Sequence, residues 1–181
     1  MAFYNGTGYA VGMITLFVEA DAPASERLTR TLAALIPAVV EGVVLDAVIL
    51  NADGSAEIEK VADAAGAVCV AGGDVAAAVD KARGDWLMCL EPGARPRGEW
   101  FDAVLSAIGE GEKIPAGPVR FRADRSMTGG LMSLFRRPRA LRCGLIIHRR
   151  QAAAAKAKSL EALARGRAAR RLNARLVTAD F

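Results

Sequence analysis

A wholly apolar run of five residues, Trp86–Leu90, most constrains what this chain can fold into. Such a run is typical of a strand that is buried on both faces of a parallel sheet. Pro92 and Gly93 end the strand, and a new helix is predicted to begin near Gly98. The loop at residues 91–97 is therefore expected at the carboxyl end of a central strand, which is where open α/β sheets bind ligands.

Strands and helices alternate along the first 108 residues of the chain. Short apolar segments predict strands at residues 14–18, 44–50, 67–70 and 86–90. The helical patterns between them begin at the N-cap residues Ser25, Ser55 and Asp74. This alternation predicts an α/β fold with a doubly wound, mostly parallel sheet and right-handed crossovers.

The length and composition fit one globular domain. A chain of 181 residues with 52% hydrophobic residues is long enough to bury a sizeable core. No apolar run reaches the roughly 20 residues of a membrane span and no signal-peptide pattern is present, so we expect a cytoplasmic protein. The three cysteines, Cys69, Cys89 and Cys143, lie far apart in apolar runs, which predicts reduced thiols rather than a zinc site.

Charge is distributed unevenly along the chain. Residues 1–113 contain 8 Lys/Arg and 17 Asp/Glu, whereas residues 114–181 contain 16 Lys/Arg and 3 Asp/Glu. Such an excess of basic residues indicates an acidic partner, unless the basic part packs on the acidic half of its own chain. The alanine-rich stretch at residues 151–177 is predicted to be helical. We therefore expect a poorly ordered leader (1–12), a domain (13–150, with halves 13–112 and 113–150) and a basic helical C-terminal segment (151–181).

The stretch around the apolar run resembles the family-two glycosyltransferases of the GT-A fold. Gly84-Asp85 precedes the apolar strand, and Trp100 stands at the start of the next helix, as in that family. The resemblance covers about residues 13–108 and implies a GT-A-like domain that binds a nucleotide sugar. In the family, an Asp-x-Asp-type motif after this strand holds a divalent metal on the diphosphate. Here Glu91 stands at the first acid and Gly93 at the second, so the implied ligand of Mg²⁺ or Mn²⁺ is Glu91.

Two further strand ends take part in the resemblance. Asp53-Gly54-Ser55 follow the second strand and match the family's turn whose acid contacts the nucleotide base or ribose. Asp21 follows the first strand, at another nucleotide-contacting corner of the family. Arg95 offers a fixed positive charge to a diphosphate. The implied nucleotide-binding residues are thus Asp21, Asp53, Gly54, Ser55 and Arg95.

The second half of the chain carries one candidate for the catalytic base. Asp124 is the only acidic residue between Lys113 and Arg150. Transfer to a hydroxyl group needs a carboxylate that takes its proton, and the family carries such an acid in this half.

Two functions are open at this point. The first is a shortened glycosyltransferase that transfers a sugar from a nucleotide sugar and is catalytically impaired, because the second metal-binding acid is missing. The second is a non-catalytic scaffold whose basic C-terminal third docks on an anionic membrane surface, an acidic protein or nucleic acid. The resemblance favours a membrane surface, and hence a place at the inner face of the membrane, because many family-two enzymes act on lipid-linked acceptors.

Overall fold

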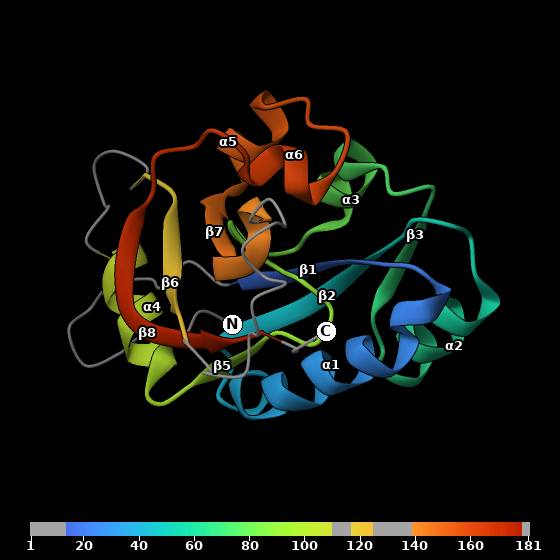
Figure 1. The fold of residues 1–181 in the computed structure, drawn as a ribbon, viewed down its shortest axis with the longest axis horizontal. Helices are drawn as coiled ribbons and strands as arrows, with labels where there is room; N and C mark the ends of the chain where they lie inside the picture. The colour runs from blue at the N-terminus through green and yellow to red at the C-terminus, as the bar shows by residue number, and fades with distance from the viewer. Residues whose placement is uncertain (1–13, 110–116, 125–138, 179–181) are drawn as a thin grey trace, which may run out of the picture.

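The structure, a computed structural model, describes residues 14–109, 117–124 and 139–178 (Figure 1). Within these residues eight strands form one mixed sheet in the order β3-β2-β1-β4-β7-β6-β8-β5. The strands are β1 (Ile14–Ala20), β2 (Val44–Asn51), β3 (Val68–Ala71), β4 (Trp86–Leu90), β5 (Arg95–Arg97), β6 (Val119–Ala123), β7 (Leu145–His148) and β8 (Arg170–Val177). The helices are α1 (Ser25–Val40), α2 (Ala56–Ala64), α3 (Val75–Lys81), α4 (Trp100–Gly109), α5 (Arg149–Ala154) and α6 (Leu160–Ala164), with 3-10 turns η1 (Ala22–Ala24) and η3 (Ala140–Cys143).

The first four strands form the parallel half of the sheet that the sequence predicts. β1 lies between β2 and β4, β3 flanks β2, and all three pairs run parallel. All five residues of β4 are buried, as expected for a strand that is covered on both faces. Ser55 and Asp74 cap their helices as predicted, whereas Ser25 is the first residue of α1 rather than its cap. The predicted α/β class is confirmed.

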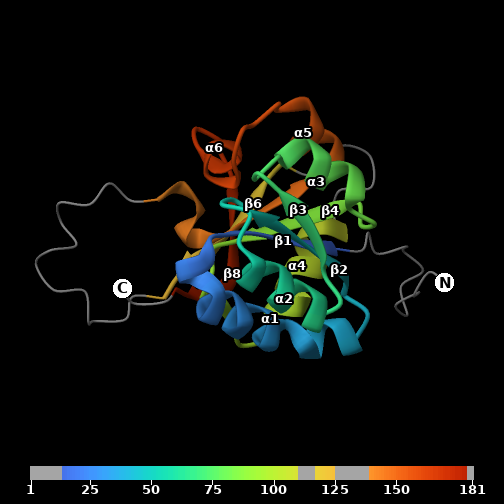
Figure 2. The same cartoon turned by 90° about the vertical axis from the view of Figure 1, so that its right-hand side faces the viewer.

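Helices cover both faces of the sheet (Figure 2). One buried apolar cluster joins the sheet to α1, α2 and α4 on one face. A second cluster joins it to α3, α5 and α6 on the other face. Neither cluster includes the side chains that the sequence assigns to nucleotide or metal binding. The core and the candidate site are therefore built from separate residues.

The second half of the sheet is joined to β4 through an antiparallel strand. β7 pairs antiparallel with β4, with Cys89 opposite Leu145, and β6 pairs with β7 on its other side. This pairing sets η3, which precedes β7, beside the carboxyl end of β4. Gly144 connects η3 to β7 with φ +60°, a conformation that strains any residue other than glycine.

The prediction of a helix over residues 151–177 is wrong beyond Ala164. The chain forms the short helices α5 and α6 and then enters the sheet as β8. β8 lies between β6 and β5, parallel to β6 and antiparallel to β5. Alternate side chains of β8 are buried: Leu172, Ala174 and Leu176. This two-residue period outweighs the helix propensity of the alanines, because it buries the leucines against α4 and the neighbouring strands.

The loop after β4 differs slightly from the prediction, whereas the cysteines do not. The predicted loop at residues 91–97 contains the short strand β5, which is stabilised by pairing with β8. Cys89 is buried, Cys69 and Cys143 are partly buried, and all three are free thiols, as predicted. The leader at residues 1–12 lies outside the described residues, and the division of the chain into segments stays a prediction.

We expect Gly144→Ala to destabilise the fold by about 2–4 kcal/mol, from backbone strain and overpacking. An added Cβ would lie 2.9 Å from Leu90 Cδ2 and 3.2 Å from Phe121 Cδ2. The control is Gly166→Ala, because φ is +72° there but no described atom lies within 4 Å of an added Cβ. In that variant the free energy of unfolding should fall only by the backbone penalty of about 1–2 kcal/mol. Urea denaturation measures both, and equal losses would contradict the close packing at Gly144.

Candidate functional site

The candidate site lies where the order of the strands changes direction. The chain runs from β1 outward through β2 to β3 and then returns to add β4 on the other side of β1. The carboxyl ends of β1 and β4 therefore lie side by side, and Asp21 and Glu91 follow them. The crevice at such a switch point is the usual ligand site of an open α/β sheet.

The first corner of the site joins the ends of β1 and β2. Asp53 accepts hydrogen bonds from Ala22 N at 3.0 Å and from Ser55 N at 3.2 Å. The buried amide of Asn51 holds the same turn through the N–H and the C=O of Ser55, both at 3.0 Å. Asp21, next to Ala22, and Asp53 are both exposed. The structure thus brings these two predicted residues together at one corner.

The turn after β4 is held against α1. Thr31, a fully buried residue of α1, accepts a hydrogen bond from Gly93 N at 2.7 Å. Ala94 N closes the turn by donating to Glu91 O at 3.0 Å. Gly93 has φ +90°. The backbone itself therefore favours glycine at the position where the family-two motif has its second acid.

The carboxyl group of Glu91 is partly buried in a cluster of charged side chains. Burial raises the pKa of Glu91 above its ordinary value, and the guanidinium of Arg139 acts in the opposite direction. The carboxylate of Glu161 also raises this pKa, whereas Arg142 and Arg27 lower it. We call these five residues the Glu91 cluster. Its members come from α1, the end of β4, η3 with its flank, and α6.

Sequence analysis missed four of these five residues. Arg27 lies on α1, Arg139 and Arg142 lie in or beside η3, and Glu161 lies on α6. The resemblance to a known family gives none of these four a role in the site, and they are distant from Glu91 along the chain. Only the excess of arginine in the second half gave a signal that positive charge would be used there.

Hydrogen bonds between side chains and the backbone fix η3 and α6 to each other. Glu161 accepts from Ala140 N at 2.7 Å and from Leu141 N at 3.1 Å. Arg120 of β6 donates to the carbonyl oxygens of Ala140 and Ala164. Arg142 and the flanking Arg139 therefore lie on a segment that is hydrogen-bonded to both α6 and β6.

α6 also contacts the end of β1. Glu19 accepts a hydrogen bond from Leu160 N, in the first turn of α6, at 2.9 Å. Gly73 lies on the same side of the sheet, since an added Cβ there would be 3.6 Å from Glu19 Oε1. The segment after β7 thus packs against the strand ends at which the first corner is built.

Two predicted residues have other surroundings. Arg95 lies on β5 opposite Val177, and its buried Nε has no hydrogen-bond partner among the described residues. Asp124, the candidate base, lies 3.8 Å from the guanidinium of Arg175 on β8. The contacts found for Asp124 are thus with β8 and not with the Glu91 cluster.

The donor set at the end of β4 does not fit a divalent cation. Mg²⁺ at phosphate sites is bound by one or two carboxylates together with phosphate oxygens. At the end of β4 Glu91 offers a single carboxylate and Gly93 offers no side chain, and the described part of the chain gathers no group of three or more His, Cys, Asp or Glu side chains suited to a metal. The positive charges of three arginines also act on Glu91.

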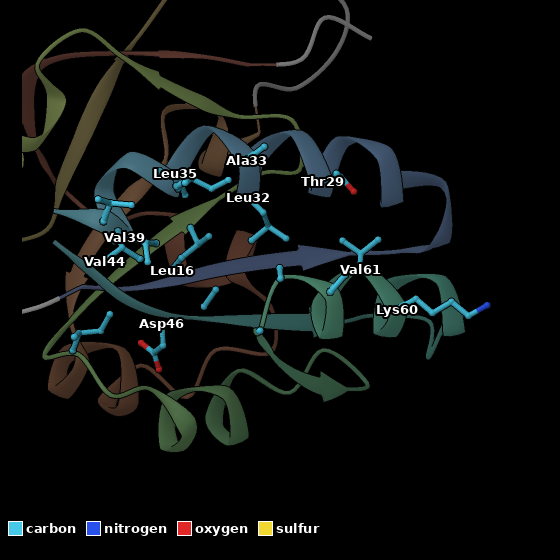
Figure 3. A pocket seen from close by; sticks show the side chains of 17 residues that line it. Leu16, Thr29, Leu32, Ala33, Leu35, Val39, Val44, Asp46, Lys60 and Val61 are labelled. Carbon is cyan, nitrogen blue, oxygen red and sulfur yellow. The ribbon is translucent and has the colours of Figure 1, made fainter. Parts of the chain in front are cut away.

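A separate apolar cavity of about 700 Å³ lies between α1 and α2 (Figure 3). Its lining includes Leu16, Leu32, Val39, Val44 and Val61. None of the residues predicted to bind nucleotide or metal lines this cavity. In the part of the chain that the structure describes, no helix has the length and apolarity of a membrane span.

Neither protein-family models nor curated proteins match the chain. Solved structures do. Glucosyl-3-phosphoglycerate synthase from M. tuberculosis superimposes with a TM-score of 0.58 at 14% identity, over 94% of this chain and 72% of that one. Its complex with Mn²⁺ and UDP-glucose gives a TM-score of 0.54 at 15% identity, over 77% of this chain and 57% of that one.

A third solved structure is mannosyl-3-phosphoglycerate synthase from Rubrobacter xylanophilus. Its TM-score is 0.54 at 13% identity, over 77% of this chain and 55% of that one. The present chain thus spans little more than half the length of that protein. At such low identity the likeness concerns the fold alone, and it shows that the chain has the GT-A fold of these glycosyltransferases.

Proposed function

We propose that the protein binds a nucleotide sugar at the carboxyl ends of β1, β2 and β4, as a glycosyltransferase with a weakened transfer step. The observation that carries this proposal is the meeting of the Asp53 turn and the Glu91 cluster at the switch point of a GT-A sheet. Solved proteins of the same fold contain UDP and UDP-glucose, which supports a nucleotide sugar as the ligand class.

The Asp53 turn and the end of β4 suit different parts of a nucleotide sugar. The exposed carboxylate of Asp21 and the open backbone of Gly54, with φ +68° and no described atom near its Cβ position, leave room for a nucleoside. The end of β4 suits the diphosphate, because Arg139 and Arg142 present exposed guanidinium groups beside it.

The weakened transfer step follows from the surroundings of the carboxylates. A general base needs a carboxylate within reach of the acceptor hydroxyl and free to take its proton. Asp124 lies beside Arg175, and Glu161 accepts two backbone hydrogen bonds from η3. Both carboxylates are thus engaged by other groups of the chain rather than directed at an acceptor hydroxyl.

We expect UDP, GDP or UDP-glucose to stabilise the protein against heat, by about 2.7 kcal/mol at one hundred times the dissociation constant. Asp21→Asn should weaken this binding about tenfold, because the hydrogen bond from a ribose hydroxyl loses its charged acceptor. Asp80→Asn makes the same charge change on an exposed position of α3 and should have no effect. The absence of any thermal shift at millimolar concentrations of all three nucleotides would overturn the proposed function.

Glu91→Gln is expected to stabilise the unliganded protein at neutral pH. Because burial raises the pKa of Glu91 in the folded state, keeping this carboxyl charged opposes folding at pH values above that pKa. Below the ordinary carboxyl pKa of about 4.3, both states are protonated and the advantage of the variant disappears. Denaturation at about pH 3.5 and pH 7.5 tests this, with the exposed Glu99→Gln as the control. A gain that is equal at both pH values would contradict it.

Docking on an anionic partner is a second candidate function, favoured by one row of arginines. Several arginines of the basic third contact their own chain and are not available: Arg120, Arg149, Arg167 and Arg170. By contrast, the exposed Arg97 on β5 and Arg122 on β6 lie on either side of Arg175 of β8, and an acid, Asp124, lies 3.8 Å from Arg175. Like charges opposite each other on neighbouring strands are destabilising, which is explained if an anionic surface binds them. A peripheral place at the membrane stays a prediction.

Vesicle flotation tests this second function. The double variant Arg97→Gln/Arg122→Gln should lose salt-sensitive binding to vesicles that contain anionic lipid, at about 1 kcal/mol per basic residue. The control is Arg150→Gln/Lys158→Gln, which removes the same charge from exposed positions elsewhere. Equal loss in both double variants, or tighter salt-sensitive binding to RNA than to vesicles, would contradict the membrane assignment.

A further inference from the structure

The fold and the side chains at the end of β4 lead to opposite expectations about a divalent cation. Solved relatives of the same fold contain Mn²⁺ or Mg²⁺ together with UDP. In this chain one partly buried glutamate stands there, followed by Gly93. We propose that Arg27, Arg139 and Arg142 bind the diphosphate of the ligand directly, and that this protein needs no divalent cation to do so. This inference rests on the proposed function and names how its ligand is held.

Strand register places Arg142 at this position independently of any charge calculation. β4 and β7 run antiparallel with Cys89 opposite Leu145, so the chain before β7 continues alongside Glu91. The contact is close, because an added Cβ on Gly144 would lie 2.9 Å from Leu90 Cδ2. Arg142, two residues before Gly144, is therefore carried next to the end of β4.

Helix α1 approaches the same turn from the other side. Thr31 holds Gly93 N, and its hydroxyl also donates to Arg27 O at 3.3 Å, one helical turn earlier. Arg27 thus lies on the side of α1 that meets the turn after β4, and its guanidinium affects Glu91. Positive charge from two separate elements converges on one turn.

The charge balance of the cluster favours an anion. Glu161 is compensated by two backbone N–H groups and lies 3.5 Å from Arg165. The remaining carboxylate, Glu91, is under the electrostatic influence of three guanidinium groups. Each of these is a planar fork that matches phosphate oxygens. The same positive charges repel a divalent cation at short range, so they replace a metal more readily than they assist one.

Calorimetry with UDP, once in EDTA and once in Mn²⁺, tests the inference. We expect dissociation constants that agree within about twofold, because fixed guanidinium groups supply the positive charge. Binding that requires Mn²⁺ and is lost in EDTA would overturn the inference and leave the proposed function standing. Absence of UDP binding in both buffers would overturn both. Binding of inorganic pyrophosphate in EDTA without any binding of UDP would keep the arginine site and overturn the nucleotide assignment.

Two substitutions give effects of opposite sign. Arg142→Ala should weaken UDP binding in EDTA about tenfold, since a charge-assisted hydrogen bond is lost. The control Arg150→Ala removes an exposed arginine at α5 and should leave the affinity unchanged. Glu91→Gln should tighten binding several-fold, because it removes the negative charge that competes with phosphate. If Glu91 is instead a metal ligand, the same variant weakens binding and the inference fails. A thermal melt confirms that each variant is folded.

Discussion

The candidate site depends on hydrogen bonds between side chains and the backbone that hold η3 in place. Glu161 accepts from two N–H groups at the start of η3, and Arg120 donates to carbonyl oxygens of η3 and α6. These contacts join α6, η3 and β6, three segments that are well separated along the chain. Because β7 begins directly after η3 and pairs with β4, the same contacts decide what stands beside Glu91. Arg142, in η3, and the neighbouring Arg139 are in this way positioned by Glu161 and Arg120.

Local sequence patterns predict the parallel half of this fold well and β8 poorly. Trp86–Leu90 and the caps at Ser55 and Asp74 are decided by neighbours in the chain, so periodicity and capping rules suffice. β8 depends on β6 and β5 for its pairing, and an alanine-rich approach hides its short alternation. The Glu91 cluster is built from four separate elements, so no local pattern reveals it. A residue-by-residue resemblance finds Glu91 but not the arginines around it.

The separation of core and site explains how the fold persists while the acids of the motif are absent. The two apolar clusters on either face of the sheet supply the burial that stabilises a domain of this size. The residues at the strand ends contribute turns and charge, and they can change without opening a cavity in the core. A sheet of this kind therefore constrains where a ligand binds far more than it constrains which chemistry follows.

The insertion of β8 between β6 and β5 has a consequence for how the protein is made. Domains form as the chain leaves the ribosome, amino-terminal parts first. The parallel strands can assemble early, but β5 and β6 have no shared neighbour until β8, the final strand of the described chain, becomes available. Until then the nascent protein presents unpaired strand edges, which are prone to pair with other chains. Slow synthesis, or a premature stop shortly before Arg170, would thus produce a nearly complete sheet that aggregates rather than a smaller folded domain.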